Sequence, residues 1–495
     1  MQAFFDKAMK IKTLITLSLL FSTNFLNAQT DVDAMRYSGE SITGTARFTA
    51  MSGAFGALGG DFTSLSYNPA GIAVYRSSEF TFTPSIYVGS TTSTFLGESN
   101  NERKYNFNIG NIGMIYTSKL SKDENSPGWK SWNFGLGYNR LSNFHNRSFY
   151  QGTNHSSSIL DNFAENASGN EPSALDGYYE SLAYNTYMIN HDGSLLYESV
   201  IPYGQETQRK STETRGSIGE TVFTFGGNYS NKFYLGGSLG FKSLRYVEST
   251  TYEEMDPDTS IPYFKRFKLQ QDLTTRGTGF DLKVGMIYRV NDMFRFGVAV
   301  ETPSWYSMHD EYKNSMTGTL DTGVTKSFSA ESPDGFFDYD YTSPFKAMGS
   351  IAVVFGKYGL VSADYQFADY SEARFDAALA PFSDVNSLIS RKYIETHTVR
   401  IGTEWLYQSL AFRGGVSLTT SPLNDKYKVG NSDFTKKGLS AGIGYRENNL
   451  FIDLGYARTQ SDEYYQPYTL SYEVVPGVKS HVVTNNFTIT MGVKF

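Results

Sequence analysis

The sequence contains no cysteine among its 495 residues, so a small secreted domain held together by disulfides is excluded. Histidine is scarce too, and none of the six residues has metal-ligand spacing or accompanies a nucleophile motif. No Ser-His pair suggests a membrane phospholipase. We therefore predict that the chain is not an enzyme and needs no metal or cofactor. The histidines are His145, His155, His191, His309, His397 and His481.

Long apolar runs are missing as well, apart from one near the N-terminus. Residues 9–28 begin with lysines, continue through an apolar stretch and end in the small residue Ala28. That order is typical of a secretory signal peptide. The stretch is shorter than the roughly 20 apolar residues that a membrane-spanning helix requires. We expect residues 1–28 to be a signal peptide, with synthesis starting at Met1 or at Met9.

A surplus of basic residues is also lacking. The formal net charge is −7, with 43 Lys and Arg against 50 Asp and Glu, so no nucleic-acid partner is expected. Glycine and aromatic residues are abundant instead, with 46 Gly, 36 Tyr and 37 Phe. The mean hydropathy lies below zero, which does not fit a helical membrane protein. Any membrane segments of this chain are therefore expected to be strands.

Alternation with a period of two recurs along the chain after residue 78. In segments such as "FDLKVGMIYRV" and "MFRFGVAVE", one face is apolar and the other carries glycine and charged residues. A membrane barrel needs this division, because one face meets lipid and the other meets the lumen. The last strand alternates strictly and ends on an aromatic residue. We expect its apolar face to be the signal read by the barrel-assembly machinery, namely Phe487, Ile489, Met491, Val493 and Phe495.

The connections between strands distinguish a barrel from a sandwich. Very short turns alternate with longer loops, the strand count is even, and both ends lie on the short-turn side, as in outer-membrane barrels. Closure also leaves no unpaired sheet edge in lipid. We predict an all-β fold, a transmembrane antiparallel β-barrel of about 14 strands at 79–495, in the outer membrane of a Gram-negative bacterium. A large extracellular loop is expected at 149–217, and further long loops at 253–263, 316–343, 375–390, 422–437 and 467–481, with a looser short linker near 121–129.

The predicted strands lie near 79–90, 104–119, 130–148, 218–231, 232–252, 264–290, 293–315, 344–357, 358–374, 391–407, 408–421, 438–448, 449–466 and 482–495. A barrel of this size is wider than one that wall side chains alone can fill. Residues 29–78 are the only long segment before the first strand, so we predict that they form an N-terminal hatch inside the lumen.

The hatch segment has local signals of its own. Apolar residues at helical spacing between Phe48 and Leu58 predict a short helix that ends at Gly59-Gly60. The following Asn-Pro pair predicts a turn, because Asn bonds its own backbone and Pro fixes φ. Small residues then let the backbone lie against a wall. This motif, to which we assign a structural or gating role, is Asn68, Pro69, Ala70 and Gly71.

At these residues the sequence resembles the FadL family of outer-membrane transporters for long-chain fatty acids and other hydrophobic compounds. The resemblance rests on "NPAG" at 68–71, on the glycine-rich run at 52–61 and on the predicted fourteen strands. The wording of residues 44–80 is similar to a divergent Bacteroidetes-type branch, whose members are often labelled hemin receptors or outer membrane transport proteins. The resemblance implies a lumenal hatch, ligand capture by extracellular loops and release through a lateral gap in the wall.

Charged residues are expected to line the lumen. A charged wall is an unfavourable environment for the apolar chain of a fatty acid. The candidate hydrophobic ligand contacts are therefore hatch residues, although the same side chains could simply form the core of the plug. These are Phe48, Met51, Phe55, Leu58, Phe62 and Ile72. The inward charges are Lys242, Asp281, Lys283, Arg289, Arg295, Glu301, Asp364, Arg400, Glu404, Arg413, Arg446 and Asp453. An inward Arg could hold a carboxylate head group.

The predicted function is uptake of hydrophobic small molecules, such as long-chain fatty acids. The expected further partners are outer-membrane lipid, lipopolysaccharide and the barrel-assembly machinery. The protein is expected to be a monomer. Three alternatives stay open. The histidines around the large loop could bind haem iron, the loop could serve adhesion, or the charged lumen could serve a porin for small polar solutes. Apolar residues between Leu175 and Met188 predict a partly apolar surface helix, or a lid that folds on itself.

Overall fold

The computed structural model describes residues 30–120, 127–201, 205–378, 381–430 and 432–495. The predicted signal peptide at 1–28 and most of the linker predicted near 121–129 lie outside them. Helices in the described ranges are short, and none is long and apolar enough to cross a bilayer.

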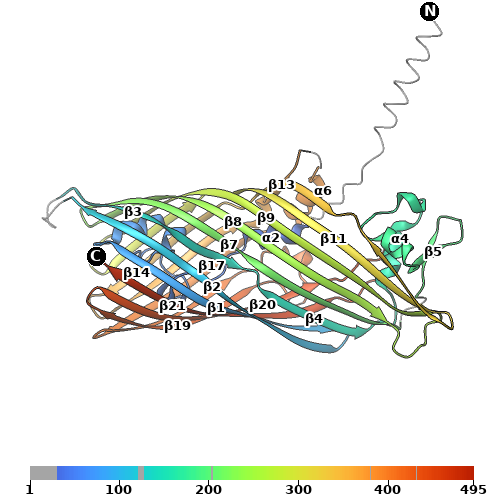
Figure 1. Ribbon diagram of the computed structural model, residues 1–495. Helices are drawn as coiled ribbons and strands as arrows, with labels where there is room; N and C mark the ends of the chain where they lie inside the picture. The colour runs from blue at the N-terminus through green and yellow to red at the C-terminus, as the bar shows by residue number, and fades with distance from the viewer. Residues whose placement is uncertain (1–29, 121–126, 202–204, 379–380, 431) are drawn as a thin grey trace, which may run out of the picture.

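The described strands form one closed antiparallel barrel (Figure 1). Its wall consists of fourteen passes, each made of one strand or of two strands in succession. The first and last strands pair along their length, from Glu79 opposite Lys494 onward, which closes the sheet. The passes are β1 (Glu79–Phe95), β2 (Glu98–Lys119), β3 (Trp129–Asn143) with β4 (Asn146–Thr153), β7 (Thr207–Tyr229), β8 (Phe233–Met255), β9 (Phe264–Arg289), β10 (Phe294–Glu301) with β11 (Trp305–Asp321), β13 (Gly335–Thr342) with β14 (Lys346–Phe355), β15 (Gly359–Asp369) with β16 (Arg374–Asp376), β17 (Glu395–Tyr407), β18 (Leu410–Thr419), β19 (Lys436–Glu447), β20 (Leu450–Tyr465) and β21 (Val478–Lys494).

An apolar belt surrounds the outside of the barrel, as the period-two pattern predicted. In β21, Phe487, Ile489 and Met491 are 50%, 44% and 44% exposed, while the alternating Thr488 and Thr490 are buried on the lumen side. Solvent exposure of this kind on a closed sheet indicates contact with lipid. The predicted fold class is therefore confirmed, and the chain is an outer-membrane barrel. The proposed reading of the terminal strand by assembly machinery stays a prediction.

Part of the wall rises well beyond the apolar belt. β7, β8 and β9 contain 23, 23 and 26 residues, whereas a tilted strand needs only about 9–11 residues to cross a bilayer. The long loop predicted at 316–343 was wrong. Instead, β11 turns at Gly323 into β12 (Thr325–Glu331), and β13 follows. The outward faces of β12 and β13 meet water rather than lipid and are therefore polar, so the sequence of this segment resembles that of a loop.

The N-terminal segment lies inside the barrel. It contains α2 (Asp31–Ser38), α3 (Ala46–Ala50) and the 3-10 helices η1 (Thr63–Ser66) and η2 (Pro69–Val74). Contacts of α3 reach β18 to β21, whereas those of η2 reach β3 and β7 to β9, on another part of the wall. The helix predicted through Leu58 was too long, because Ser52 and Gly53 adopt positive φ and end α3.

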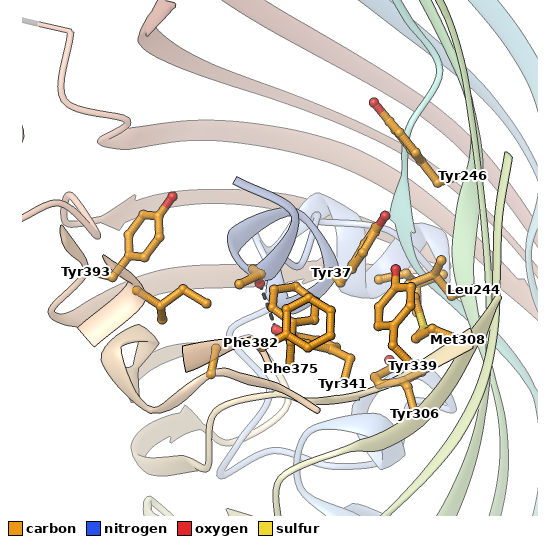
Figure 2. Close-up of a cluster of buried hydrophobic side chains, with 14 of the residues drawn as sticks. Tyr37, Leu244, Tyr246, Tyr306, Met308, Tyr339, Tyr341, Phe375, Phe382 and Tyr393 are labelled. Carbon is orange, nitrogen blue, oxygen red and sulfur yellow. Dashed lines mark hydrogen bonds between the residues drawn. The ribbon is translucent and has the colours of Figure 1, made fainter. Parts of the chain in front are cut away.

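Helix α2 was not predicted, and it carries a large part of the lumenal core. Figure 2 shows Tyr37 from this helix among aromatic side chains from β8, β11, β13 and the β15–β17 connection. Its ring packs edge-on against Tyr246 and Tyr341, and Tyr341 donates to the Ala34 carbonyl at 2.8 Å. The connection itself contributes α6 (Ser383–Lys392), which packs on α2. The hatch is thus held by aromatic packing at its outer end.

A cap closes over the tall side of the wall between β4 and β7. The connection spans 154–206, narrower than the predicted 149–217 because the flanking strands continue further. It folds into α4 (Ile159–Ala167), η3 (Pro172–Ala174), α5 (Glu180–Asn185) and a small hairpin, β5 (Ile189–His191) with β6 (Tyr197–Ser199). Leu182 and Met188 are buried in the core of the cap. The apolar residues of this loop therefore pack mainly on each other and on the strand tops.

Candidate functional site

A cavity of about 530 Å³ lies in the lumen between the hatch and the wall. Its walls combine hydroxyl groups of β1, β7, β17, β18, β20 and β21 with aromatic rings. The aromatic lining residues are Phe48, Tyr67, Tyr87, Phe144, Tyr150, Tyr246, Tyr370, Phe434 and Tyr465. Lys210 donates to the Tyr465 hydroxyl at 2.6 Å between two strands of the lining, β7 and β20. Such a surface suits an amphipathic molecule, with rings for an apolar body and hydroxyls for a polar end.

Two hatch rings and one arginine form the inner end of the cavity. Phe48 and Tyr67 stack with centroids 5.0 Å apart, and the Arg400 guanidinium lies 5.7 Å from the Tyr67 ring. Arg400 donates to Gln366 at 2.8 Å and has no ion-pair partner in the part of the chain that the structure describes. Arg400 lines the cavity, with Asp364 of β15 as its register partner, so its positive charge faces any anionic group held there.

One side of the cavity coincides with a break in the wall. β2 pairs with β3 only from Asn111 opposite Asn139 downward. Above that point β2 pairs with β1, while β4 pairs with β7, and no β2–β4 ladder is present among the described residues. The strand predicted at 130–148 is accordingly interrupted at 144–145. Outside this break, Phe107 of β2 is 72% exposed, so the break borders the apolar belt.

The hatch takes the place of the missing strand at the break. Ser41 donates its backbone N–H to the Leu141 carbonyl at 2.9 Å, and the Thr43 hydroxyl contacts the Arg140 carbonyl. A Cβ on Gly110 of β2 would lie 3.1 Å from the Gly44 carbonyl. Residues 41–44 thus cover the β3 edge that β2 leaves unpaired. Side chains across the break, such as Asn106 and Asn143, meet by a 3.1 Å hydrogen bond.

The structure distributes the predicted ligand contacts unevenly. Phe48 lines the cavity. Met51, Phe55 and Leu58 pack behind it against Ala352, and Phe62 and Ile72 belong to a separate cluster with Leu65, Tyr75, Ile115 and Val222. All six are at most 3% exposed. The pattern did not indicate most of the other lining residues, among them Tyr67, Tyr246 and the segment at 39–43.

The Asn-Pro motif packs between the hatch and the wall. Asn68 accepts the Ala70 N–H at 3.1 Å and so caps η2, and its amide donates to the Gly56 carbonyl at 2.6 Å. Only glycine fits opposite it, because a Cβ on Gly285 of β9 would lie 1.9 Å from the Asn68 side chain. Gly71 of the same motif donates its N–H to the Asn68 carbonyl at 3.0 Å and packs on Gly59. The motif therefore anchors one side of the hatch.

Ion pairs anchor the other side. Arg47 of α3 makes two 2.8 Å bonds to Glu404 of β17. Glu404 also accepts from Arg413, which in turn reaches Asp453, both at 2.6 Å. A second network joins Lys242, Lys283 and Lys346 to Glu220, Asp281, Glu301 and the hatch residue Glu40. Most of the predicted inward charges are thus buried and paired, whereas Arg289, Arg295 and Arg446 are only partly buried.

The histidines considered for haem are not gathered at one site. His145 lies at the wall break with Asn106 and Asn143, while His191 stacks on Tyr184 and contacts the Tyr197 ring in the cap. His155 is exposed at the start of the cap. No cluster of metal-ligating side chains occurs within the residues that the structure places.

A buried carboxyl cluster fastens the cap to the wall beyond the membrane. Glu254 at the top of β8 accepts from Ile159 N at 2.9 Å, Tyr252 at 2.7 Å and Gln208 at 3.0 Å. Gln208 also donates to Glu206 at 2.8 Å. Burial, and then the nearby Glu254, raise the pKa of Glu206 to about 9. Both carboxyl groups are fully buried.

We expect the cap to become less stable as pH rises. Between about pH 4.5 and about pH 9, folded Glu206 keeps a proton that the unfolded chain releases, so the free energy of cap opening falls with rising pH. The expected loss is about 1–2 kcal/mol, since relaxation limits the full effect of burial. Amide exchange over α4, corrected for its intrinsic pH dependence, measures the opening.

In this test, Glu206→Gln should weaken the pH dependence and leave the part that comes from Glu254, whose pKa burial raises to about 7. Glu198→Gln, at an exposed position of β6, should retain the full dependence. Equal slopes in the two variants would show that another group governs the cap.

No family model matches the chain, and no curated protein matches it in sequence. Solved structures do match. The crystal structure of a Pseudomonas aeruginosa FadL homologue is 10% identical, with a TM-score of 0.56, over 92% of this chain and 99% of that one. The crystal structure of the P. putida toluene transporter TodX is 13% identical, with a TM-score of 0.50, over 92% and 99%. The predicted resemblance is therefore confirmed at the level of the fold.

Proposed function

We propose that this barrel with the FadL-type fold takes up hydrophobic small molecules through the outer membrane, with amphipathic molecules such as long-chain fatty acids as the favoured cargo. The observation that carries the proposal is the position of the cavity. It lies between the aromatic face of the hatch and a break in the β2–β3 backbone ladder that borders the apolar belt. The fold neighbours, a FadL homologue and a toluene transporter, support the same class of cargo.

The cavity chemistry favours a cargo with a polar end. Arg400 provides a positive charge at the inner end, beside the stacked rings of Phe48 and Tyr67. Arginine binds carboxylates through two parallel N–H donors. The apolar body would then extend along Tyr87 and Tyr246. A porin is disfavoured because the hatch contacts several parts of the wall and is fixed there by buried ion pairs.

We propose that release is lateral, through the break between β2 and β3–β4. A backbone ladder is the barrier that a closed barrel presents to sideways movement, and it is absent here above Asn111. The cover consists of hatch residues 41–44, held to β3 by the Ser41 and Thr43 hydrogen bonds. Such bonds contribute about 0.5–1.5 kcal/mol each, so a small movement of the hatch would open the path.

Cross-linking the two sides of the break should block uptake. The chain has no native cysteine, so Asn106→Cys with Asn143→Cys can be joined by a short cleavable bis-maleimide. We expect uptake of radiolabelled oleate by cells lacking their own transporter to fall at least about five-fold, because opening is the step that is blocked. Cleaving the linker should restore it.

The matched control joins Thr459→Cys and Thr484→Cys, which face each other on the fully paired β20 and β21 and also line the cavity. Inhibition by both cross-links would indicate that the linker only fills the cavity. Inhibition by neither would refute lateral release, and no oleate uptake by the unmodified chain would refute the proposed function itself.

A further inference from the structure

A row of outward-facing arginines stands just above the apolar belt on the tall side of the wall. Phe241, Phe280 and Trp305 mark the upper edge of the belt, and they are 48%, 46% and 40% exposed. Phe241 is opposite Phe280, and Phe280 is opposite Trp305. Arg245 follows Phe241 by four residues in β8, and Arg276 precedes Phe280 by four residues in the antiparallel β9, so both arginines lie above the belt. Both are on the same outward face as these rings, because side chains alternate with a period of two.

The two arginines oppose each other directly. Arg245 of β8 is the register partner of Arg276 of β9. Directly opposite side chains on neighbouring strands are about 4.5–5.5 Å apart at Cβ, and like charges there are destabilising. Arg215 of β7 is the partner of Val247, two residues from Arg245, so its guanidinium lies on the diagonal of the same outward face. Three guanidinium groups therefore occupy three adjacent strands.

Nearby carboxylates do not neutralise this row. Glu213 is shared by Arg215, Arg147 and Lys104. Glu311 is shared by Arg276 and His309, and His309 also contacts Asp338. Arg245 has no ion-pair partner among the residues that the structure describes. Four permanent cations, Arg215, Arg147, Lys104 and Arg276, thus share the two carboxylates Glu213 and Glu311, and Arg245 adds a fifth positive charge. The side chains of Arg215 and Arg276 remain 64% and 54% exposed.

We propose that Arg215, Arg245 and Arg276 bind the phosphate groups of outer-leaflet glycolipids of the lipid A type. The layer directly above a hydrocarbon belt is the head-group layer, so an anion there lies at the height of these side chains. The planar guanidinium matches phosphate with paired donors, and a shared phosphate removes the repulsion between Arg245 and Arg276. This proposal depends on the membrane position of the barrel and not on its transport activity.

The test compares lipid binding to the full chain in detergent, measured by native mass spectrometry. The probes are lipid A with two phosphates and the same lipid after enzymatic dephosphorylation. Since each arginine near a charged surface contributes about 1 kcal/mol, we expect phosphorylated lipid A to bind at least about ten-fold more tightly. The variant Arg215→Gln, Arg245→Gln, Arg276→Gln should lose this preference while keeping the strand content of the original barrel.

The matched control removes three exposed cations near the top of the same wall, by Arg266→Gln, Lys268→Gln and Lys326→Gln. It changes the net charge equally but lies farther along the strands from the belt, and it should keep the preference. An equal loss in both variants, or none in the first, would overturn the proposal. Displacement of lipid A by excess inorganic phosphate would also overturn it, because the site would then be a general anion site.

Discussion

Deletion of residues 30–76 should convert the closed barrel into an ion-conducting pore. The hatch fills the lumen with α3 on β18 to β21 and η2 on β3 and β7 to β9, and a fourteen-strand wall lies between the filled eight-strand and the open sixteen-strand sizes. We expect the conductance in planar bilayers to rise at least roughly ten-fold over the full-length chain. The buried charges of both networks would then line the pore.

The deletion variant must first be shown to fold, by strand content and heat modifiability. A shorter deletion that stops before Ser41 provides the control, because it removes α2 but leaves the Arg47–Glu404 contact and the NPAG motif in place. That variant should conduct little more than the full chain. A folded 30–76 deletion with unchanged conductance would mean that wall side chains or the cap seal the lumen without the hatch.

The barrel was predictable because membrane strands obey a simple rule. Lipid on one face and lumen on the other force alternation, as at Phe487, Ile489 and Met491. Turns of two or three residues, such as those at Asn231 and Asn448, mark the strand ends through positive φ. The rule fails above the belt, where the outward face meets water instead of lipid and becomes polar. That is why β12 and β13 resemble a loop in sequence.

The hatch was predictable in place but not in detail. A capping pair was present at its start, since Thr30 donates its N–H to Asp33 at 2.9 Å, and this signal could have indicated α2. The spacing of Phe48, Met51 and Phe55 suggested a longer helix, but Gly53 at φ +79° bends the chain after one turn. Turns bring the same apolar residues together without a helix.

The candidate site was harder to predict than the fold, because a cavity is the space that the packed side chains leave unfilled. Apolar spacing cannot separate Phe48, which lines the cavity, from Phe62, which is enclosed by Leu65 and Ile72. The wall break depends on a register between distant strands, Asn111 with Asn139. The hydroxyl-rich strand faces did not indicate a binding site either, because hydroxyl side chains suit a water-filled lumen and a ligand-binding lumen equally.

The ion pairs that join hatch and wall give the last prediction its large expected effect. Glu404 holds both Arg47 and Arg413 with side-chain exposures of 5%, 13% and 0%. Glu404→Gln keeps the shape of the side chain but leaves Arg47 buried without its partner. Breaking a buried pair in this way costs about 3–5 kcal/mol. We expect the hatch to open more often, with amide exchange at residues 45–60 faster by about two to four orders of magnitude.

A double replacement separates charge from packing. Arg47→Met alone leaves Glu404 paired with Arg413. Arg47→Met combined with Glu404→Gln removes the guanidinium that Glu404→Gln alone leaves unpaired. In both variants the amides of residues 45–60 should therefore exchange more slowly than in Glu404→Gln. Asp462→Asn breaks an exposed pair with His481 and should change little, because exposed pairs contribute about 0–1 kcal/mol. If the double variant opens as readily as Glu404→Gln, the wall holds the hatch by shape and not by charge, and a transport step that moves residues 41–44 need not break this ion pair.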